Sequence, residues 1–422
     1  MEAWSSWFMA PHLKCDERES VPWVRIPPLP PILPLPITVI ERTLNPSIGV
    51  RISEGHPLNT FVITNRERFI MSKVLFILKR REDYDQKLHA NVRLSTGLYN
   101  SASFMTDMLN DSGIQSDIAV AIDNNCIDKI VTDYKPTHVI IEALWVVPTK
   151  FAVLTKLHPT VQWIIRLHSE MPFMAGEGMA MDWIGDYLSF PNVHIGVNAP
   201  RMHEEIQAFI STKTGWSRTQ INDRIIYLPN YYPQYYLNKN FVKDKNWVDV
   251  SCFGAVRPLK NHLSQAIAAI KFADKIDKQL RFHINVGRIE MKGDPVLRNL
   301  KGLFQHLAGS KLNHQLIGHS WMQRDKFLKV CASMDIGMQC NFSETFNIVS
   351  ADLISQGVPI VGSEEIPWAS RFFNAKPSFS DDMSNALLRT YKFPNINVYL
   401  NQKNLTKYTN NTNKIWQQYF KE

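Results

Sequence analysis

Residues 342–363 read FSETFNIVSADLISQGVPIVGS, and this stretch decides the fold. A strand-like apolar run ends near Cys340, a helical pattern begins near Thr345, Gly357 ends that pattern, and the apolar run Val358–Val361 follows it. A strand, a helix and a second strand in this order form one unit of a parallel sheet covered by helices. The stretch therefore predicts an α/β protein.

Two acidic residues accompany the predicted helix. Glu344 stands at its N-terminus, past the carboxyl end of a strand, where α/β proteins bind ligands. Asp352 follows about two turns later and is expected on the same helix face. Carboxylates so placed can each accept hydrogen bonds from sugar hydroxyls. The alternative is that Glu344 only stabilises the helix dipole and that Asp352 faces solvent.

The start of this helix also offers backbone donors. Its first N–H groups, at Thr345, Phe346 and Asn347, have no partner within the helix, and the helix dipole adds partial positive charge there. A helix end of this kind binds an anion or a hydroxyl. We therefore expect these three residues to contact the ligand.

A second motif, CFGAVRPLKNH at residues 252–262, follows the first strand-like run of the second half of the chain. Gly254 permits a close approach of the backbone, Arg257 offers a forked donor, and Lys260 offers a point charge. This combination suits a diphosphate. The alternative is a solvated basic loop.

A third motif, IIRLHSEMPF at residues 164–173, places His168 just past a buried strand and so at the ligand-binding edge of a sheet. A histidine there can hydrogen-bond a hydroxyl group of a ligand. A lone histidine is, however, more often structural. Ser169 and Glu170 follow His168 at the same edge.

Strand-like and helix-like segments alternate from residue 71 in two rounds, with a hinge rich in Pro and Asn between them. The pattern predicts two Rossmann-like domains, 71–232 and 246–375, whose parallel sheets face a central cleft. Residues 1–70 contain a run of prolines that favours polyproline II, and we expect a disordered extension there. Alternatives for that extension are translated upstream sequence or a ligand for a proline-binding module.

Composition narrows the class of protein. The net charge of +8 suits DNA, an anionic membrane face or a phosphorylated substrate, although a basic protein without any polyanionic partner is equally compatible. No apolar run is long enough to span a membrane, and no secretory signal is recognisable. The 5 cysteines form no CxxC pair, and neither zinc-ligand spacing nor a P-loop occurs. The sequence thus favours a cytoplasmic protein.

The motifs resemble a known family. The pattern of Glu344, seven residues, an acidic residue, and then Gly-Val-Pro-Ile-Val looks like the Glu-x7-Glu signature of retaining GT-B glycosyltransferases, the glycogen-synthase-like "glycosyl transferases group 1". The resemblance implies that Glu344 contacts the transferred sugar and that Asp352 holds the ribose of the nucleotide. Asp352 departs from the pattern, because glutamate is usual there. The GT-B fold is the expectation that follows.

Further roles are implied by the same resemblance. Lys260 and Arg257 would stabilise the departing nucleoside diphosphate. His168 would lie close to the donor sugar and would hydrogen-bond a hydroxyl or stabilise a transition state of oxocarbenium character. Ser169 and Glu170 would be candidates for the acceptor side. Gly97 corresponds to a glycine loop near the acceptor and phosphates, while Gly318 and His319, after the strand expected at 313–317, correspond to a loop beside the nucleotide base. The C-terminal residues 376–422 would form helices that cross back to the first domain.

The predicted function is transfer of a hexose from a nucleoside-diphosphate sugar to a hydroxyl, with retention and without metal or cofactor. The acceptor we expect is a glycan or a lipid-linked glycan, reached by peripheral association with the inner membrane face. DNA carrying hydroxymethylated bases is a second candidate acceptor. A non-catalytic nucleotide-sugar-binding module and a sugar-nucleotide epimerase are alternatives of other classes. The sequence does not predict an oligomeric state.

Overall fold

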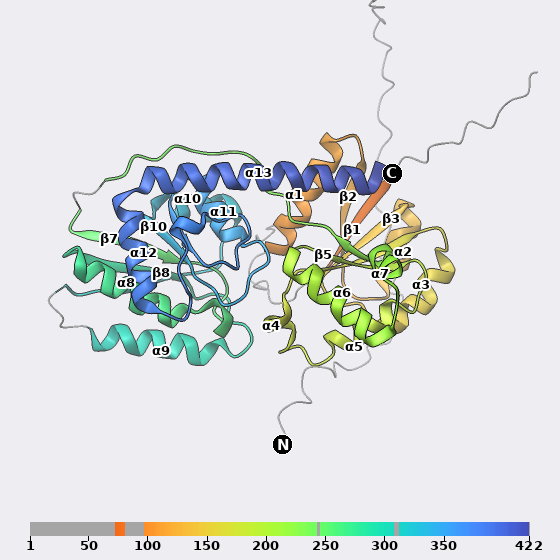
Figure 1. Ribbon diagram of the computed structural model, residues 1–422, viewed down its shortest axis with the longest axis horizontal. Coiled ribbons are helices and arrows are strands. Elements are labelled where there is room, and N and C mark those ends of the chain that lie inside the picture. Colours follow the sequence, from red (N-terminus) through yellow and green to blue (C-terminus); the bar gives the residue numbers. More distant parts are fainter. Residues whose placement is uncertain (1–71, 81–96, 243–244, 308–311, 422) are drawn as a thin grey trace, which may run out of the picture. The chain divides into compact units, whose positions relative to one another are not determined.

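The computed structural model describes residues 72–80, 97–242, 245–307 and 312–421. The extension expected over residues 1–70 lies outside these described residues. Where the chain is described, it forms two all-parallel sheets with helices packed against them (Figure 1). The predicted α/β class with two Rossmann-like domains is therefore confirmed.

The first sheet has the strand order β2-β1-β3-β4-β5-β6. Its inner strands are largely apolar because both faces of a parallel sheet are covered, whereas one edge strand carries polar and exposed residues. The strands are β1 (Lys73–Lys79), β2 (Gln115–Ala121), β3 (His138–Glu142), β4 (Gln162–Leu167), β5 (Val193–Val197) and β6 (Ile225–Tyr227). The accompanying helices are α1 (Gly97–Asp111), α2 (Cys126–Tyr134), α3 (Phe151–Leu157), α4 (Met171–Met174), α5 (Ala180–Tyr187), α6 (Pro200–Thr214) and α7 (Arg218–Arg224).

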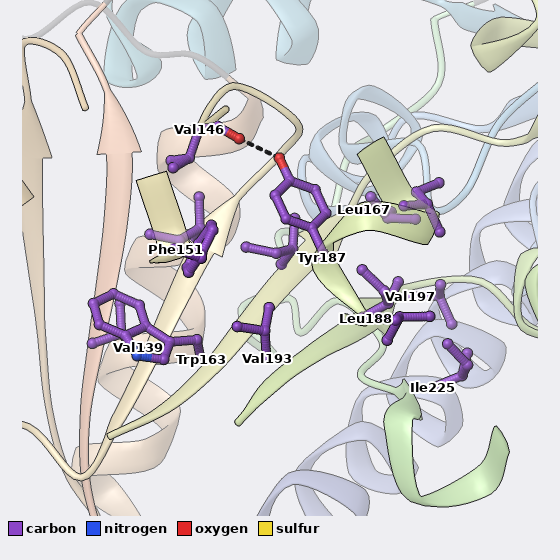
Figure 2. Packing of buried hydrophobic residues seen from close by; sticks show 14 of the residues in the cluster. Val139, Val146, Phe151, Trp163, Leu167, Tyr187, Leu188, Val193, Val197 and Ile225 are labelled. Carbon is purple, nitrogen blue, oxygen red and sulfur yellow. Dashed lines mark hydrogen bonds between the residues drawn. The ribbon is translucent and has the colours of Figure 1, made fainter. Parts of the chain in front are cut away.

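Aromatic side chains fill one layer of the core beside this sheet (Figure 2). The ring of Phe151 packs edge-on against Trp163 and Tyr187, with centroid separations of 5.6 and 5.5 Å. The hydroxyl of Tyr187 points to the carbonyl of Val146 and donates a hydrogen bond to it. This bond matters because a buried hydroxyl without a partner costs free energy. The core therefore fixes the loop that follows β3.

The second sheet has the strand order β11-β10-β7-β8-β9. Its strands are β7 (Trp247–Cys252), β8 (Gln279–Asn285), β9 (Gln315–His319), β10 (Ile336–Gln339) and β11 (Ile360–Gly362). The accompanying helices are α8 (His262–Lys275), α9 (Gly293–His306), α10 (Arg324–Ser333), α11 (Ile348–Ser355) and α12 (Ser380–Lys392). Gly357 ends α11 as predicted, in the left-handed conformation with φ of +71°. An added Cβ there would lie 2.6 Å from the carbonyl oxygen of Leu237.

One long helix, α13 (Pro394–Lys421), runs along both domains (Figure 1). Near its N-terminus the amide of Asn397 pairs with the backbone of Ile360 in the second sheet, at 3.0 and 2.7 Å. Near its C-terminus Trp416 donates to the carbonyl of Pro229 at 2.8 Å and packs beside Phe76 of β1. Helix α13 therefore contributes to the cores of both domains.

Candidate functional site

A cavity of about 820 Å³ lies at the carboxyl ends of strands from both sheets. It is the place where parallel α/β proteins bind ligands. Ten of the predicted site residues line this cavity, from both halves of the chain: Gly97, His168, Ser169, Gly254, Arg257, Lys260, Glu344, Thr345, Phe346 and Asn347. The three motifs are therefore brought together around one cavity.

Lys260 and Glu344 form an ion pair in the wall of the cavity, with 10% of each side chain exposed. The ammonium group of Lys260 contacts Oε1 of Glu344, and Asn341 donates to the same oxygen at 2.9 Å. Within the described part of the chain, Oε2 of Glu344 has no such partner. That oxygen can therefore accept a hydrogen bond from a bound hydroxyl.

Two arginines line the cavity next to this pair. The guanidinium of Arg257 stacks on Phe173, 4.7 Å from the ring centroid, and lies 3.5 Å from the carboxylate of Glu290. Arg288 donates to the other oxygen of Glu290 at 2.6 Å and stacks on Trp321 at 5.1 Å. Stacking and ion pairing orient both guanidinium groups, whose forked N–H donors match the spacing of phosphate oxygens.

The helix after Glu344 begins later than predicted. Helix α11 starts at Ile348, because Asn347 adopts the left-handed conformation with φ of +61° and its side chain accepts from the N–H of Ser350 at 2.8 Å. Within the described part of the chain, the N–H groups of the first turn that lack a partner therefore belong to Ile348 and Val349, not to Thr345, Phe346 and Asn347 as expected. Both Ile348 and Val349 line the cavity, so the helix N-terminus still faces it.

A buried ion pair supports the histidine at the end of β4. Glu142 and Arg166 occupy paired positions of β3 and β4, and their side chains are fully buried. Nη1 of Arg166 lies 3.1 Å from Oε1 of Glu142, and His168 contacts the other oxygen of that carboxylate. Burial alone would raise the pKa of Glu142, but Arg166 and His168 outweigh burial and lower that pKa. The carboxylate is therefore ionised.

These contacts fix the protonation pattern of His168. Burial lowers the pKa of His168 despite the neighbouring carboxylate of Glu142, which favours the neutral ring. Nε2–H then donates to Glu142, while Nδ1 accepts from the amide of Asn198 at 3.3 Å. The same amide donates to Thr345 at 3.1 Å. A sugar hydroxyl that reaches Nδ1 of His168 must therefore compete with Asn198.

Asp352 lies deeper than the other predicted residues. It is 2% exposed and borders a smaller cavity of about 50 Å³, which shares Gly97 and Gly254 with the main cavity. Its Oδ1 accepts from Tyr232 at 2.8 Å and from Arg324 at 2.7 Å. Burial raises the pKa of Asp352, although Arg324 and Tyr232 oppose the rise. Glu344 lies outside α11, so the expectation that it shares a helix face with Asp352 was wrong.

Three predicted residues lie outside the lining of the two cavities described here. Glu170 is buried and pairs with Arg201, which also pairs with Glu365 of the second domain, so its carboxylate is committed to an ion-pair network. Gly318 and His319 belong to strand β9, not to a loop after it. The ring of His319 stacks on His283, and Nε2 of His319 lies 2.9 Å from Nδ1 of His283.

Sequence reasoning missed several residues of the site. Glu142 and Arg166 are charged residues inside apolar strand runs, which was a usable signal, because a buried charge needs a partner. Arg288 comes three residues after β8, and it lines the same cavity as Arg257, so its place after a strand was a usable signal. Asn198 and Tyr232 carry no comparable signal, because polar residues after strands are common.

Solved structures of other proteins resemble this chain in fold. The chain is similar to sucrose-phosphate synthase from Thermosynechococcus elongatus, with 11% identity, a TM-score of 0.57, and coverage of 82% of this chain and 98% of that one. It is similar to the UDP-forming α,α-trehalose-phosphate synthase from Burkholderia vietnamiensis, with 10% identity, a TM-score of 0.57, and coverage of 83% and 96%.

A third likeness is to a trehalose-6-phosphate structure from E. coli bound with UDP-2-fluoro glucose, with 10% identity, a TM-score of 0.58, and coverage of 83% of this chain and 99% of that one. No family model matches the chain, and no curated protein matches it in sequence. At this identity the likeness concerns the fold. The chain has the GT-B fold, which confirms the fold that the sequence motifs predicted.

Proposed function

We propose that the protein is a glycosyltransferase that moves a hexose from a nucleoside-diphosphate sugar to a hydroxyl of a glycan or lipid-linked glycan. One observation carries the proposal. Lys260, Arg257 and the N-terminus of α11 converge on the cavity wall that also presents the carboxylate of Glu344. Cationic groups suit a diphosphate, and a carboxylate suits sugar hydroxyls. The UDP-forming and UDP-sugar-bound structures of the same fold support this choice of donor.

The diphosphate would lie against the basic side of the cavity. Lys260 and Arg257 neutralise the charge that develops as the bond between the anomeric carbon and the phosphate oxygen breaks. The free N–H groups of Ile348 and Val349 donate to the same phosphates, in line with the dipole of α11. These groups are held in position before the ligand arrives, so they need little reorganisation during the reaction.

The two carboxylates would hold the rest of the donor. Oε2 of Glu344 accepts from hydroxyls of the hexose, because Lys260 and Asn341 engage only Oε1. Asp352 is anchored through Oδ1 by Tyr232 and Arg324, and its Oδ2 accepts from a ribose hydroxyl. The smaller cavity beside Asp352 adjoins the main one, so ribose and diphosphate can be bound together.

The acceptor hydroxyl would enter from the first domain, past Gly97, His168 and Ser169. With retention, its oxygen forms a bond to the anomeric carbon on the face from which the diphosphate leaves, and its proton passes to the departing phosphate oxygen. His168, fixed by Glu142, shapes the sugar pocket. Exclusion of water by the two domains prevents hydrolysis of the donor.

A donor screen tests this function. The full chain is incubated with UDP-, GDP- and ADP-hexoses and a mixture of glycan extracts, and released nucleoside diphosphate is measured alongside the sugar product. We expect release that depends on the acceptor and is lost in Lys260→Ala. Conversion of the sugar without release of diphosphate would instead identify an epimerase. Binding without either reaction would indicate a non-catalytic module and would overturn the proposal.

A further inference from the structure

Helix α13 has one side buried along its whole length. Every third or fourth residue is buried. The buried side chains of the N-terminal half contact the second domain, and those of the C-terminal half contact the first domain. The buried positions are Asn397, Asn401, Leu405, Thr409, Thr412, Trp416 and Phe420. A helix with 3.6 residues per turn places these positions on one side. The other side of α13 faces away from both cores.

The outer side of α13 carries four exposed lysines: Lys403, Lys407, Lys414 and Lys421. At 100° per residue they fall within about 40° of one another, and they span about 27 Å of the helix axis. The 28 residues of α13 include no aspartate or glutamate. Among the described residues, Lys403, Lys407 and Lys414 form no ion pair, while Lys421 bonds only Gln417. The stripe is thus an unneutralised row of positive charge.

Exposed apolar side chains continue the stripe at its N-terminal end. Ile396 lies seven residues before Lys403 and Tyr399 four residues before it, so both fall on the lysine side of the helix. Their exposed fractions are 52% and 62%, and Phe393, directly before the helix, is 47% exposed. Large apolar side chains are unfavourable when they are exposed to water. Together with a row of basic residues they suit a membrane surface, which has charged headgroups and an apolar interior.

We infer that this face of α13, defined by Phe393, Ile396, Tyr399 and the four lysines, docks on an anionic lipid bilayer. The lysines meet the negative headgroups, and the apolar residues enter the boundary with the acyl chains, where tyrosine is well accommodated. A nucleic acid would complement the lysines but would leave Ile396 and Phe393 in water. No described helix is long and apolar enough to cross a bilayer, so the contact is peripheral.

Vesicle binding by the full chain tests the inference. The probes are vesicles of phosphatidylcholine alone and of phosphatidylcholine with phosphatidylserine, and the readout is co-sedimentation at low and high salt. We expect binding only to the anionic vesicles, weakened by salt. The triple variant K403Q/K407Q/K414Q should bind roughly a hundredfold more weakly. The variant I396S/Y399S should lose the part of the binding that survives high salt.

The matched control is K129Q/K156Q/K301Q, which removes the same charge from α2, α3 and α9. It should bind nearly as well as the wild type. Circular dichroism melting verifies that all variants are folded. Equal weakening in the control and α13 variants, or no binding to anionic vesicles, would overturn the inference. Binding of duplex DNA through the same lysines, without binding of vesicles, would also overturn the inference. Because the readout is binding, a failed donor screen leaves this inference unaffected.

Discussion

Glu142 and Arg166 face each other across strands β3 and β4 as a fully buried ion pair, with Nη1 of the arginine 3.1 Å from Oε1 of the glutamate. Arg166 also donates through Nε to the carbonyl of Leu228 at 3.1 Å and contacts the amide oxygen of Asn230. The pair thus links two strands, the segment after β6 and His168. Its removal affects both the first domain and the site.

The first prediction concerns stability. Arg166→Met leaves the carboxylate of Glu142 buried without its main partner, so we expect the free energy of unfolding to fall by about 3–5 kcal/mol. Urea denaturation measures the change. The double variant Glu142→Gln/Arg166→Met should lose less than the single variant, because no uncompensated charge remains. Lys271→Met, which breaks the exposed pair with Asp381, is the control and should change little. Equal losses in all three variants would contradict the prediction.

The second prediction concerns turnover. Lys260→Ala removes the charge nearest to Glu344 and the expected partner of the diphosphate, so transfer should fall by about 10²–10³-fold. Steady-state release of nucleoside diphosphate measures the loss, and calorimetry with the nucleotide measures binding. Lys301→Ala, on the exposed side of α9, removes the same charge far from the cavity and should leave the rate unchanged. A Lys260→Ala enzyme with full activity would refute the site assignment.

The third prediction concerns the ribose. If Oδ2 of Asp352 accepts from a ribose hydroxyl, the wild type should bind the ribonucleoside diphosphate about tenfold more tightly than its 2′- or 3′-deoxy form. Asp352→Asn should bind the ribonucleotide more weakly and lose most of this discrimination. Tyr232→Phe is the control. It removes one hydrogen bond to Oδ1 of Asp352 and should retain the discrimination between the ribonucleotide and its deoxy forms. Discrimination that persists unchanged in Asp352→Asn would show that Asp352 serves only its ion pair with Arg324.

The fourth prediction concerns pH. Burial, with Lys260 and Arg257 nearby, lowers the pKa of His262 to about 3, below the usual 6.5. The unfolded chain therefore binds a proton that the folded chain rejects, and stability falls as pH drops below 6.5. Between pH 7 and pH 5 this histidine should cost about 2 kcal/mol of unfolding free energy. In His262→Gln the loss over that interval should be smaller by that amount, as measured by urea denaturation at both pH values.

Much of the fold was predictable because parallel strands and their helices carry strong local patterns. The helix expected before Gly357 forms as α11, and Gly357 follows its C-terminus as expected. The start of α11 was misplaced by three residues, because the left-handed turn at Asn347 is stabilised by a side-chain bond to Ser350 that no periodicity reveals. The periodicity of apolar residues predicts that a helix forms, but the N-cap residue determines where the helix begins.

Site residues that belong to a sequence motif were predictable. Site residues whose contacts depend on the pairing of strands were not. Lys260 and Glu344 come from separate motifs at two strand ends, so their shared edge was expected. The contact of Glu142 with Arg166 depends on the register of β3 against β4, which the sequence does not state. The partners of Asp352 come from α10 and from the segment after β6, far apart in the chain.

Helix α13 was expected from the family resemblance alone, because its buried side is partly polar. Asn397 and Thr412 take positions that in most helices are apolar, and they bond the backbone of Ile360 and Asn230. Their pattern therefore shows no apolar period. Only the contacts with distant segments distinguish such a helix from a solvated one.

The packing of Trp416 and Phe420 against β1 has a consequence for biosynthesis. These two residues complete the core around Val74, Phe76 and Leu78, yet almost the whole chain separates them in sequence. The first strand can therefore bury this face only after the chain has been synthesised as far as Phe420. During elongation that apolar surface stays open to chaperones, and premature termination late in the message leaves it uncovered.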